Sequence, residues 1–282
     1  MARAALENNQ ASAVNRLVLT AKNYGDSVGD ILGESGIDVM DKVIIITGGA
    51  GGIGSALCSA LAADGLKVVV ADYAKDAAEK TVAEICQAKG QGTAIQVDVG
   101  SQESVAQMMR RAIEKYGHVD VLFNGAGVMT RIPVVEMAEE EWDRILRINL
   151  KGTFLCSQAA ARHMIARQQG RILSIASGRG VAGQARASHY AASKAGVIAF
   201  TKSLAAELAP YHITVNAVCP GATDTPMSRA GSTPEEFKKR EAIPPLMDGL
   251  TEKDEIVGLV RYLLSDATRF VTGQTFFLRT PK

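Results

Sequence analysis

The sequence predicts one doubly wound α/β domain, with about seven parallel strands covered by helices on both faces. Short β-branched runs alternate along the chain with stretches of helical spacing, as in parallel sheets joined by crossover helices. Several of the strand runs are almost wholly apolar, as expected when both faces of a strand are buried. The first run leads directly into a glycine-rich turn and a helix. The domain is predicted over residues 41–282, after an N-terminal extension at residues 1–40.

The elements are expected in a regular order. Each predicted strand is a run of four to six residues rich in β-branched or aromatic side chains: Val43–Thr47, Val68–Ala71, Thr93–Val97, Val119–Asn124, Arg171–Ile175, Thr214–Val218 and Thr275–Leu278. Each predicted helix has apolar residues spaced three or four apart: Ile53–Ala63, Ala74–Lys89, Glu103–Tyr116, Glu140–Arg167, Tyr190–Ala209 and Lys253–Leu264.

Two segments stand outside this alternation. Residues 1–40 are polar to mildly amphipathic; they are interpreted as a partly ordered arm, with an oligomer contact or a cap over the sheet as the alternative. Residues 225–248 contain four prolines among apolar side chains. A segment of this kind suits a lid over a substrate, and the alternative is an ordinary surface excursion between a helix and a strand.

The composition is that of a soluble globular protein. Hydrophobic residues make up 47% of the chain and charged residues 22%, both ordinary values. The net charge of +1 predicts neither a nucleic-acid partner nor binding to an anionic membrane. No apolar run approaches the roughly 20 residues that cross a bilayer, and the N-terminal apolar stretch is too short for a signal sequence. We expect a cytoplasmic protein.

The four cysteines are widely separated in the sequence, so neither a disulfide framework nor a zinc site is predicted. They are expected to be reduced, buried thiols: Cys58, Cys86, Cys156 and Cys219. No metal site is predicted elsewhere.

The glycine-rich turn predicts a dinucleotide site. Its sequence, Thr47-Gly48-Gly49-Ala50-Gly51-Gly52-Ile53-Gly54, lies between a predicted strand and a predicted helix. Glycines allow a tight turn and let the backbone approach a pyrophosphate at the helix N-terminus. The run fits both G-x-G-x-x-G and G-x-x-x-G-x-G, and the strand–turn–helix context supports either reading.

An acidic residue at the end of the second strand predicts the kind of dinucleotide. Asp72 lies 18 residues after Gly54, where a carboxylate can accept hydrogen bonds from both adenosine ribose hydroxyls. It would repel a 2′-phosphate, and the glycine turn contains no arginine or lysine to attract one. Both observations favour NAD over NADP, with a solvated turn residue as the alternative for Asp72. Asp98 and Val99 close the third strand, where a side chain can meet the adenine.

Tyr190 and Lys194 form a candidate acid/base pair. Residues four apart on a helix share a face, and a nearby ammonium favours the phenolate, so Lys194 is expected to lower the pKa of Tyr190 from its usual value of about 10. A chance Tyr-x-x-x-Lys spacing is the alternative, because a short motif alone is weak evidence.

Further motifs follow in an order that resembles the short-chain dehydrogenase/reductase family, over about residues 41 to 278. The glycine turn fits the family's T-G-x-x-x-G-x-G, and Asn124-Gly125-Ala126-Gly127 stands where the family has N-N-A-G. Ser177 precedes Tyr190 by 13 residues. Other matches are Asn149-Leu150-Lys151-Gly152, Asn216, Pro220-Gly221 with Thr223 and Thr225, and Gly273-Gln274.

The resemblance implies a Rossmann-type oxidoreductase that interconverts a secondary alcohol and a ketone by hydride transfer with NAD(H). Tyr190 would be the general acid/base, Ser177 would stabilise charge on the substrate oxygen, and Lys194 would hold the nicotinamide ribose. Asn149 would anchor a relay water, and the family's usual assembly implies a homotetramer, or a dimer. Cofactor contacts are expected at Gly48, Gly51, Gly52, Ile53, Gly54, Asp72, Tyr73, Asp98, Val99, Asn124, Ala126, Gly127, Tyr190, Lys194, Pro220, Gly221, Thr223 and Thr225.

Two departures from the family pattern stand out. Gly125 replaces the usual second asparagine, so a local stability cost is expected. Arg279 and Pro281 stand where many relatives have an aspartate and two glycines, which puts subunit contacts of the C-terminus in doubt.

The substrate is left open between a 3-oxoacyl thioester, a sugar or polyol, a steroid and a small cyclic ketone. Cations near the predicted site favour an anionic substrate, and the alternative is that they face solvent or a neighbouring subunit; they are Arg131, Arg179, Arg186 and His189. A non-catalytic NAD-binding protein is the competing class, although its expected loss of catalytic residues is not seen.

Overall fold

The computed structural model describes residues 41–230, 233–243 and 249–279. In this part of the chain the strands form one parallel sheet of seven strands in the order β3-β2-β1-β4-β5-β6-β7. The predicted fold class is confirmed, and each strand boundary lies within two residues of the predicted one. The strands are β1 (Val43–Thr47), β2 (Lys67–Asp72), β3 (Gln91–Gln96), β4 (Val121–Asn124), β5 (Gly170–Ile175), β6 (Ile213–Cys219) and β7 (Thr275–Phe277).

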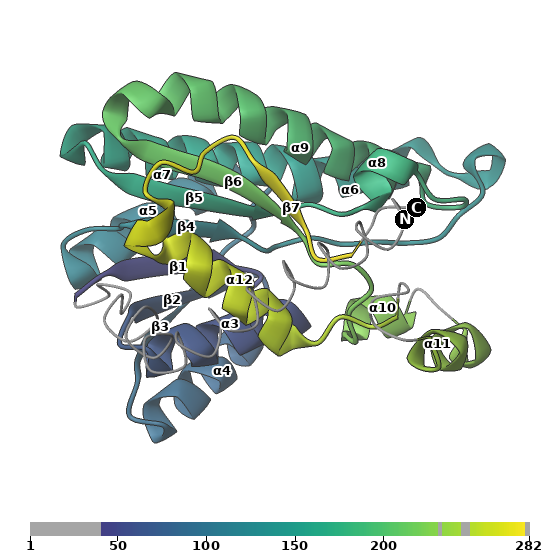
Figure 1. Cartoon of the computed structure of the whole chain (residues 1–282), viewed down its shortest axis with the longest axis horizontal. Helices are drawn as coiled ribbons and strands as arrows, with labels where there is room; N and C mark the ends of the chain where they lie inside the picture. Colours follow the sequence, from purple (N-terminus) through teal and green to yellow (C-terminus); the bar gives the residue numbers. More distant parts are fainter. Residues whose placement is uncertain (1–40, 231–232, 244–248, 280–282) are drawn as a thin grey trace, which may run out of the picture.

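Helices join the strands and cover both faces of the sheet (Figure 1). Five of the six predicted helices are present as single helices, the sixth is divided in two, and three short helices, α8, α10 and α11, were not predicted. Their bounds are α3 (Gly52–Ala63), α4 (Lys75–Gln87), α5 (Gln102–Tyr116), α6 (Glu139–Leu146), α7 (Gly152–Arg167), α8 (Arg179–Ala182), α9 (Ser188–Leu208), α10 (Pro226–Ala230), α11 (Pro234–Glu241) and α12 (Lys253–Leu264).

The prediction of one continuous helix over Glu140–Arg167 was wrong. A π-helical turn at Arg147–Lys151 separates α6 from α7. Asn149 lies in this turn, fully buried, and its side chain bonds to Val128 and Ser193 instead of facing solvent. Such a turn inserts an extra residue into a helix and commonly marks a functional site. Helical periodicity in the sequence does not distinguish it from an α-helix.

The strand β1 shows how the sheet is buried on both faces. Val43 and Ile45 pack with α5, α7 and α9 on one face, whereas Ile44 and Ile46 pack with α3, α4 and α12 on the other. Successive side chains of a strand point to opposite faces, so an unbroken apolar run is what two helical layers require.

The order of strands in the sheet reverses between β1 and β4: β2 and β3 lie on one side of β1, and β4 and the later strands lie on the other. After β1 the chain enters α3 on one face of the sheet, and after β4 it continues to α6 and α7, with α7 packed on the other face. The carboxyl ends of these two adjacent strands therefore border a crevice, which is where ligands bind in open α/β sheets.

The predicted lid falls partly outside the described residues, and its role remains a prediction. Within the described part, α10 and α11 lie near the carboxyl ends of β6 and β7 (Figure 1). Phe237 of α11 is buried, and the Arg229 guanidinium lies 4.4 Å from the centre of its ring. The predicted extension at residues 1–40 lies wholly outside the described residues.

Candidate active site

A cavity of about 900 Å³ opens at the carboxyl ends of the strands, beside the crevice between β1 and β4. The predicted cofactor and catalytic residues line it, with the exception of Asn124 and Asn149, which lie behind its wall. The lining residues among them are Gly48, Gly51, Gly52, Ile53, Gly54, Asp72, Tyr73, Asp98, Val99, Ala126, Gly127, Ser177, Tyr190, Lys194, Pro220, Gly221, Thr223 and Thr225.

The glycine turn leaves no room for side chains where it enters α3. Gly48 has φ +68°, and its carbonyl oxygen accepts from the Gly51 N–H at 3.0 Å. A Cβ on Gly54 would lie 2.0 Å from that same oxygen. The turn can therefore bring its backbone and the first N–H groups of α3 against an anionic group, as a pyrophosphate site requires.

Asp72 holds the glycine turn against the end of β2. One of its carboxylate oxygens accepts from the Ala50 N–H and the other from the Ala74 N–H, each at 3.0 Å. An ionised carboxylate has about four acceptor positions, so two remain for hydroxyl donors inside the cavity. The residue is thus more than a solvated turn residue.

The carboxylate of Asp98 is paired with an arginine that was not predicted. The Arg147 guanidinium of the π-helical turn lies 2.9 Å and 3.2 Å from its two oxygens. Burial alone would raise the pKa of Asp98, but hydrogen bonds from Arg147 and from the Gly100 N–H outweigh burial and lower it. Asp98 therefore faces the cavity as a charge-compensated carboxylate.

The structure brings Ser177, Tyr190 and Lys194 together, but it reverses the expected effect on Tyr190. Burial raises the pKa of the Tyr190 phenol, and its hydrogen bond with Ser177 offsets this only in part. The Lys194 Nζ lies 5.8 Å from the centre of the Tyr190 ring and donates to the Ile175 carbonyl at 2.7 Å. The expectation that Lys194 lowers the pKa of Tyr190 was wrong for this arrangement, because burial dominates.

Lys194 is itself strongly affected by burial. Its side chain reaches the Ile175 carbonyl from the middle of α9, and the residue is only 4% exposed. Desolvation of the ammonium lowers its pKa from 10.5 to about 8. Lys194 is therefore poised to change its charge within about a unit of neutral pH.

This shift predicts a measurable pH dependence of stability. Between about pH 8 and pH 10.5 the unfolded chain binds more protons at Lys194 than the folded chain does, so stability rises with pH in that window. We compare the free energy of unfolding of the wild type with that of Lys194→Met. The wild type minus variant difference should increase by roughly 2 kcal/mol when the pH is raised from 7 to 9.5. Urea denaturation at the two pH values measures the difference. A difference in unfolding free energy between the two proteins that does not change with pH would contradict the lowered pKa of Lys194.

Asn149 connects the π-helical turn to the two segments that carry the cavity wall. Its Oδ1 accepts from the Val128 N–H at 2.8 Å, and its Nδ2 donates to the Val128 carbonyl at 2.9 Å and to the Ser193 hydroxyl at 3.1 Å. Ser193 in turn donates to the Tyr190 carbonyl at 2.7 Å. The backbone carbonyl of Asn149 accepts from the Thr153 hydroxyl at 2.8 Å. The relay water at Asn149 remains a prediction.

Asn124 and Gly125 fix the end of β4. The Asn124 amide donates to the hydroxyls of Ser157 on α7 and Ser174 on β5, at 3.0 and 3.1 Å. A Cβ on Gly125 would lie 2.7 Å from the Thr47 carbonyl oxygen. The stability cost expected at Gly125 remains a prediction, but in this backbone any side chain there would crowd β1.

The sequence did not single out Arg279 as a site residue, yet its side chain lines the cavity. It is only 7% exposed and pairs with both carboxylate oxygens of Glu255 on α12, at 2.8 and 2.9 Å. Its Cγ lies 3.0 Å from where a Cβ on Gly221 would stand. No sequence signal could have found this pair, because the two residues meet only when β7 is laid against α12.

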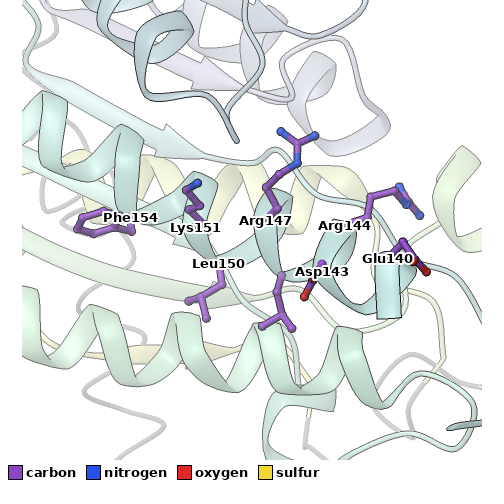
Figure 2. Close-up of a pocket in the computed structure, with 8 residues that line it drawn as sticks. Glu140, Asp143, Arg144, Arg147, Leu150, Lys151 and Phe154 are labelled. Carbon is purple, nitrogen blue, oxygen red and sulfur yellow. The ribbon is translucent and has the colours of Figure 1, made fainter. Parts of the chain in front are cut away.

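A second hollow, of about 730 Å³, lies over α6, the π-helical turn and the start of α7. Figure 2 shows Arg147 pointing away from Leu150 across this surface. Leu150 packs on α9, since a Cβ on Gly196 would come within 2.7 Å of its side chain. Arg144 and Arg147 border both hollows. None of the predicted catalytic residues lines this second hollow.

Other expectations concern cysteines, metals and membranes. Cys58, Cys156 and Cys219 are buried free thiols, whereas Cys86 is exposed, which corrects its prediction. Burial raises the pKa of the three buried thiols. Among the described residues, no three His, Cys, Asp or Glu side chains gather as a metal site would require. No helix in the same ranges has the length and hydropathy to traverse a bilayer.

Known proteins are similar to this chain in both sequence and fold. The sequence profile of the short chain dehydrogenase family matches residues 42–236. A 3-oxoacyl-[acyl-carrier-protein] reductase of Synechocystis is 39% identical over 238 residues, which cover 83% of this chain and 94% of the relative. The short-chain reductase protein NovJ of Streptomyces niveus is 36% identical over 242 residues, or 83% of this chain and 91% of NovJ.

A solved structure agrees with these relatives. The chain matches a short-chain type dehydrogenase/reductase from Mycobacterium marinum with a TM-score of 0.80 and 33% identity, covering 86% of this chain and 95% of that one. The matching profile and these relatives indicate the same family. The cavity beside the crevice between β1 and β4 lies where an enzyme with this sheet binds its ligands. The chain belongs to the short-chain dehydrogenase family and is an oxidoreductase acting on alcohol and carbonyl groups.

Proposed function

We propose that this enzyme transfers hydride between NAD(H) and a ketone or secondary alcohol, with Tyr190 as the general acid/base. The observation that carries the proposal is that Ser177, Tyr190 and Lys194 line the same cavity as the glycine turn, with the Ser177 hydroxyl close enough to Tyr190 to lower its pKa. A proton donor and a second hydroxyl thus converge beside a dinucleotide site. A screen of ketones and alcohols that follows NADH absorbance in both directions tests it.

The residues present fit a bound dinucleotide. The Gly48–Gly54 contact is too close to admit a Cβ, so the backbone of the turn stays uncovered, and the start of α3 offers backbone N–H groups to a pyrophosphate. The Asp72 carboxylate suits a ribose diol, and the Pro220–Gly221 turn lines the part of the cavity beside Arg279. The nicotinamide, when bound, supplies or accepts the hydride.

The protein residues divide the proton chemistry between them. During reduction, Tyr190 gives its phenolic proton to the substrate oxygen, and the Ser177 hydroxyl donates a hydrogen bond to the same oxygen as negative charge develops. The raised pKa of Tyr190 keeps the phenol protonated and ready to donate. Lys194, whose Nζ lies 5.8 Å from the centre of the Tyr190 ring, would hold the ribose hydroxyls of a bound dinucleotide.

The preference for NAD over NADP is a separate proposal and rests on Asp72. A 2′-phosphate would place its charge against this carboxylate, whereas a ribose diol can donate to it. We expect NADH to bind at least about tenfold more tightly than NADPH, since one lost charged hydrogen bond is worth about that factor. Asp72→Ala should weaken NADH binding and reduce the difference in affinity between NADH and NADPH. Fluorescence titration with both cofactors measures this, and tighter binding of NADPH by the wild type would refute it.

Among the possible substrates, a 3-oxoacyl thioester has specific support. Relatives at 35 to 39% identity carry the name 3-oxoacyl-[acyl-carrier-protein] reductase. The cavity that Ser177 and Tyr190 line also presents cations that suit an anionic carrier, among them Arg131 and Arg179. Acetoacetyl thioesters of a carrier protein and of coenzyme A therefore head the substrate panel, ahead of sugars, steroids and cyclic ketones.

The assembly proposed for the enzyme is a homotetramer, as the family resemblance implies. The surface of α7 and α9 supports it, because Phe154 is 40% exposed there and stacks edge-on with Phe200 at 6.1 Å.

A further inference from the structure

A partly buried chain of hydrogen-bonded side chains runs from the residue before Tyr190 to the surface of α6. It links His189 at the start of α9, Thr130 after β4, and Glu141 and Arg144 of α6. The His189 Nε2 lies 2.9 Å from the Thr130 hydroxyl, and that hydroxyl donates to the Glu141 carboxylate. Arg144 holds both oxygens of Glu141, at 2.7 and 2.9 Å.

The direction of each hydrogen bond between His189 and Arg144 follows from the ionisation of Glu141. The pKa of Glu141 is lowered to about 2, chiefly by its hydrogen bonds with Arg144, although burial acts against this. Glu141 is therefore an ionised carboxylate and only accepts. Because Thr130 gives it the single hydroxyl proton, Thr130 can only accept from His189. The proton on the His189 ring thus resides on Nε2, and each donor in the chain points toward α6.

His189 is held neutral within this chain. Its side chain is fully buried, and burial lowers its pKa; Glu141 opposes this effect and Arg144 adds to it. Its Nδ1 has no hydrogen-bond partner among the described residues, so a second ring proton there would be buried without an acceptor. The Nε2–Thr130 bond is thus the ring's single polar tie to the described part of the protein.

The start of α9 has no side-chain cap, so contacts with other segments help to fix its position. The first N–H groups of a helix lack partners within it, and Ala187, at the N-cap, has no polar side chain to supply one. Arg186, just before it, adopts a left-handed backbone with φ 63°. Bonds that hold this region to the segment after β4 include His189 to Thr130, and the Ile132 N–H to the Arg186 carbonyl at 2.7 Å. Tyr190 is the third residue of α9.

We propose that Thr130 and His189 are positioning residues for Tyr190, and that the chain from His189 to Arg144 fixes the first turn of α9 so that the Tyr190 hydroxyl stays against Ser177. The role rests on the proposed function, since it concerns the geometry of its general acid. Thr130 and Tyr190 are otherwise separated by 60 positions and lie on different elements. Removing the Thr130 hydroxyl should therefore disturb proton transfer more than ligand binding.

The test compares Thr130→Val with Thr130→Ser in the full chain. Valine keeps the shape and removes the hydroxyl, whereas serine restores it. We expect Thr130→Val to lower kcat about tenfold, because small misplacements of a catalytic group cost up to about a hundredfold. KM for the carbonyl substrate and Kd for NADH should stay within about twofold, and Thr130→Ser should recover most of the lost kcat.

A second readout needs no substrate. In protein labelled at tyrosine, the ring signals of Tyr190, assigned by their loss in Tyr190→Phe, should shift in Thr130→Val and remain in place in Thr130→Ser. If Thr130→Val does not fold, Glu141→Gln replaces it, because a neutral amide weakens the same chain from the surface.

The outcomes separate the two proposals. Wild-type kcat in Thr130→Val together with unmoved Tyr190 signals would overturn the positioning role and leave the proposed function intact. If the wild type turns over no carbonyl with NADH, the proposed function fails, and the tyrosine spectra alone then decide whether the chain positions Tyr190.

Discussion

Tyr190→Phe is expected to lower kcat for carbonyl reduction by about 10² to 10⁴, the range found when a general acid is removed. The change deletes one oxygen and leaves the ring in its buried site between Ser177 and Lys194. Binding of NADH should stay within about twofold of wild type, because the phenol acts on the substrate oxygen. Steady-state kinetics together with fluorescence titration measures both quantities.

A matched control for this variant is Tyr116→Phe. The Tyr116 hydroxyl makes a 2.7 Å hydrogen bond with Thr93, away from the cavity. Its loss should cost about 1 kcal/mol of stability and leave kcat unchanged. A Tyr190→Phe enzyme that keeps most of its activity would show that another group supplies the proton.

Gly54→Ala is expected to abolish measurable NADH binding. The added Cβ would stand 2.0 Å from the Gly48 carbonyl oxygen, a backbone atom of the turn, and the Cβ itself is fixed to the backbone of α3. Since neither can move aside without opening the turn, α3 loses its close approach to the pyrophosphate. We expect at least about a hundredfold weaker binding, equivalent to about 2.7 kcal/mol, and a lower Tm from overpacking.

Gly258→Ala provides the comparison for Gly54→Ala. This glycine lies within α12, and a Cβ there would meet no atom within 4 Å among the described residues. Alanine should stabilise the helix by up to about 1 kcal/mol and leave NADH binding unchanged. Circular dichroism checks that both variants are folded. If folded Gly54→Ala binds NADH as the wild type does, the turn is not the pyrophosphate site.

Most of the fold could be predicted because its signals are local. Each apolar run of a strand buried on both faces is contiguous in the sequence, and β1 and α12 were predicted with the bounds that the structure shows. The strict order of Asn149, Ser177, Tyr190 and Lys194 places the candidate site without reference to three-dimensional contacts. The π-helical turn was missed because its periodicity differs little from that of an α-helix.

The rest of the site depends on contacts between distant segments. Arg147 meets Asp98 across 49 positions, and His189 meets Thr130 across 59; neither pair leaves a pattern in the sequence. The direction of the Tyr190 pKa shift was mispredicted for the same reason. The i, i+4 spacing indicated a nearby ammonium, but the burial that outweighs it arises from packing of α9 against the sheet.

The central claim is that hydride passes between the nicotinamide and a carbonyl carbon in this cavity. The direct measurement is reduction of an acetoacetyl thioester with NADH that carries deuterium at both hydrogen positions of nicotinamide C4, followed by mass spectrometry of the product. The account predicts a 3-hydroxyacyl thioester with one deuterium on the carbinol carbon, or the equivalent alcohol from another ketone of the panel. Tight binding of NADH with no deuterated alcohol from any of these carbonyls would contradict it.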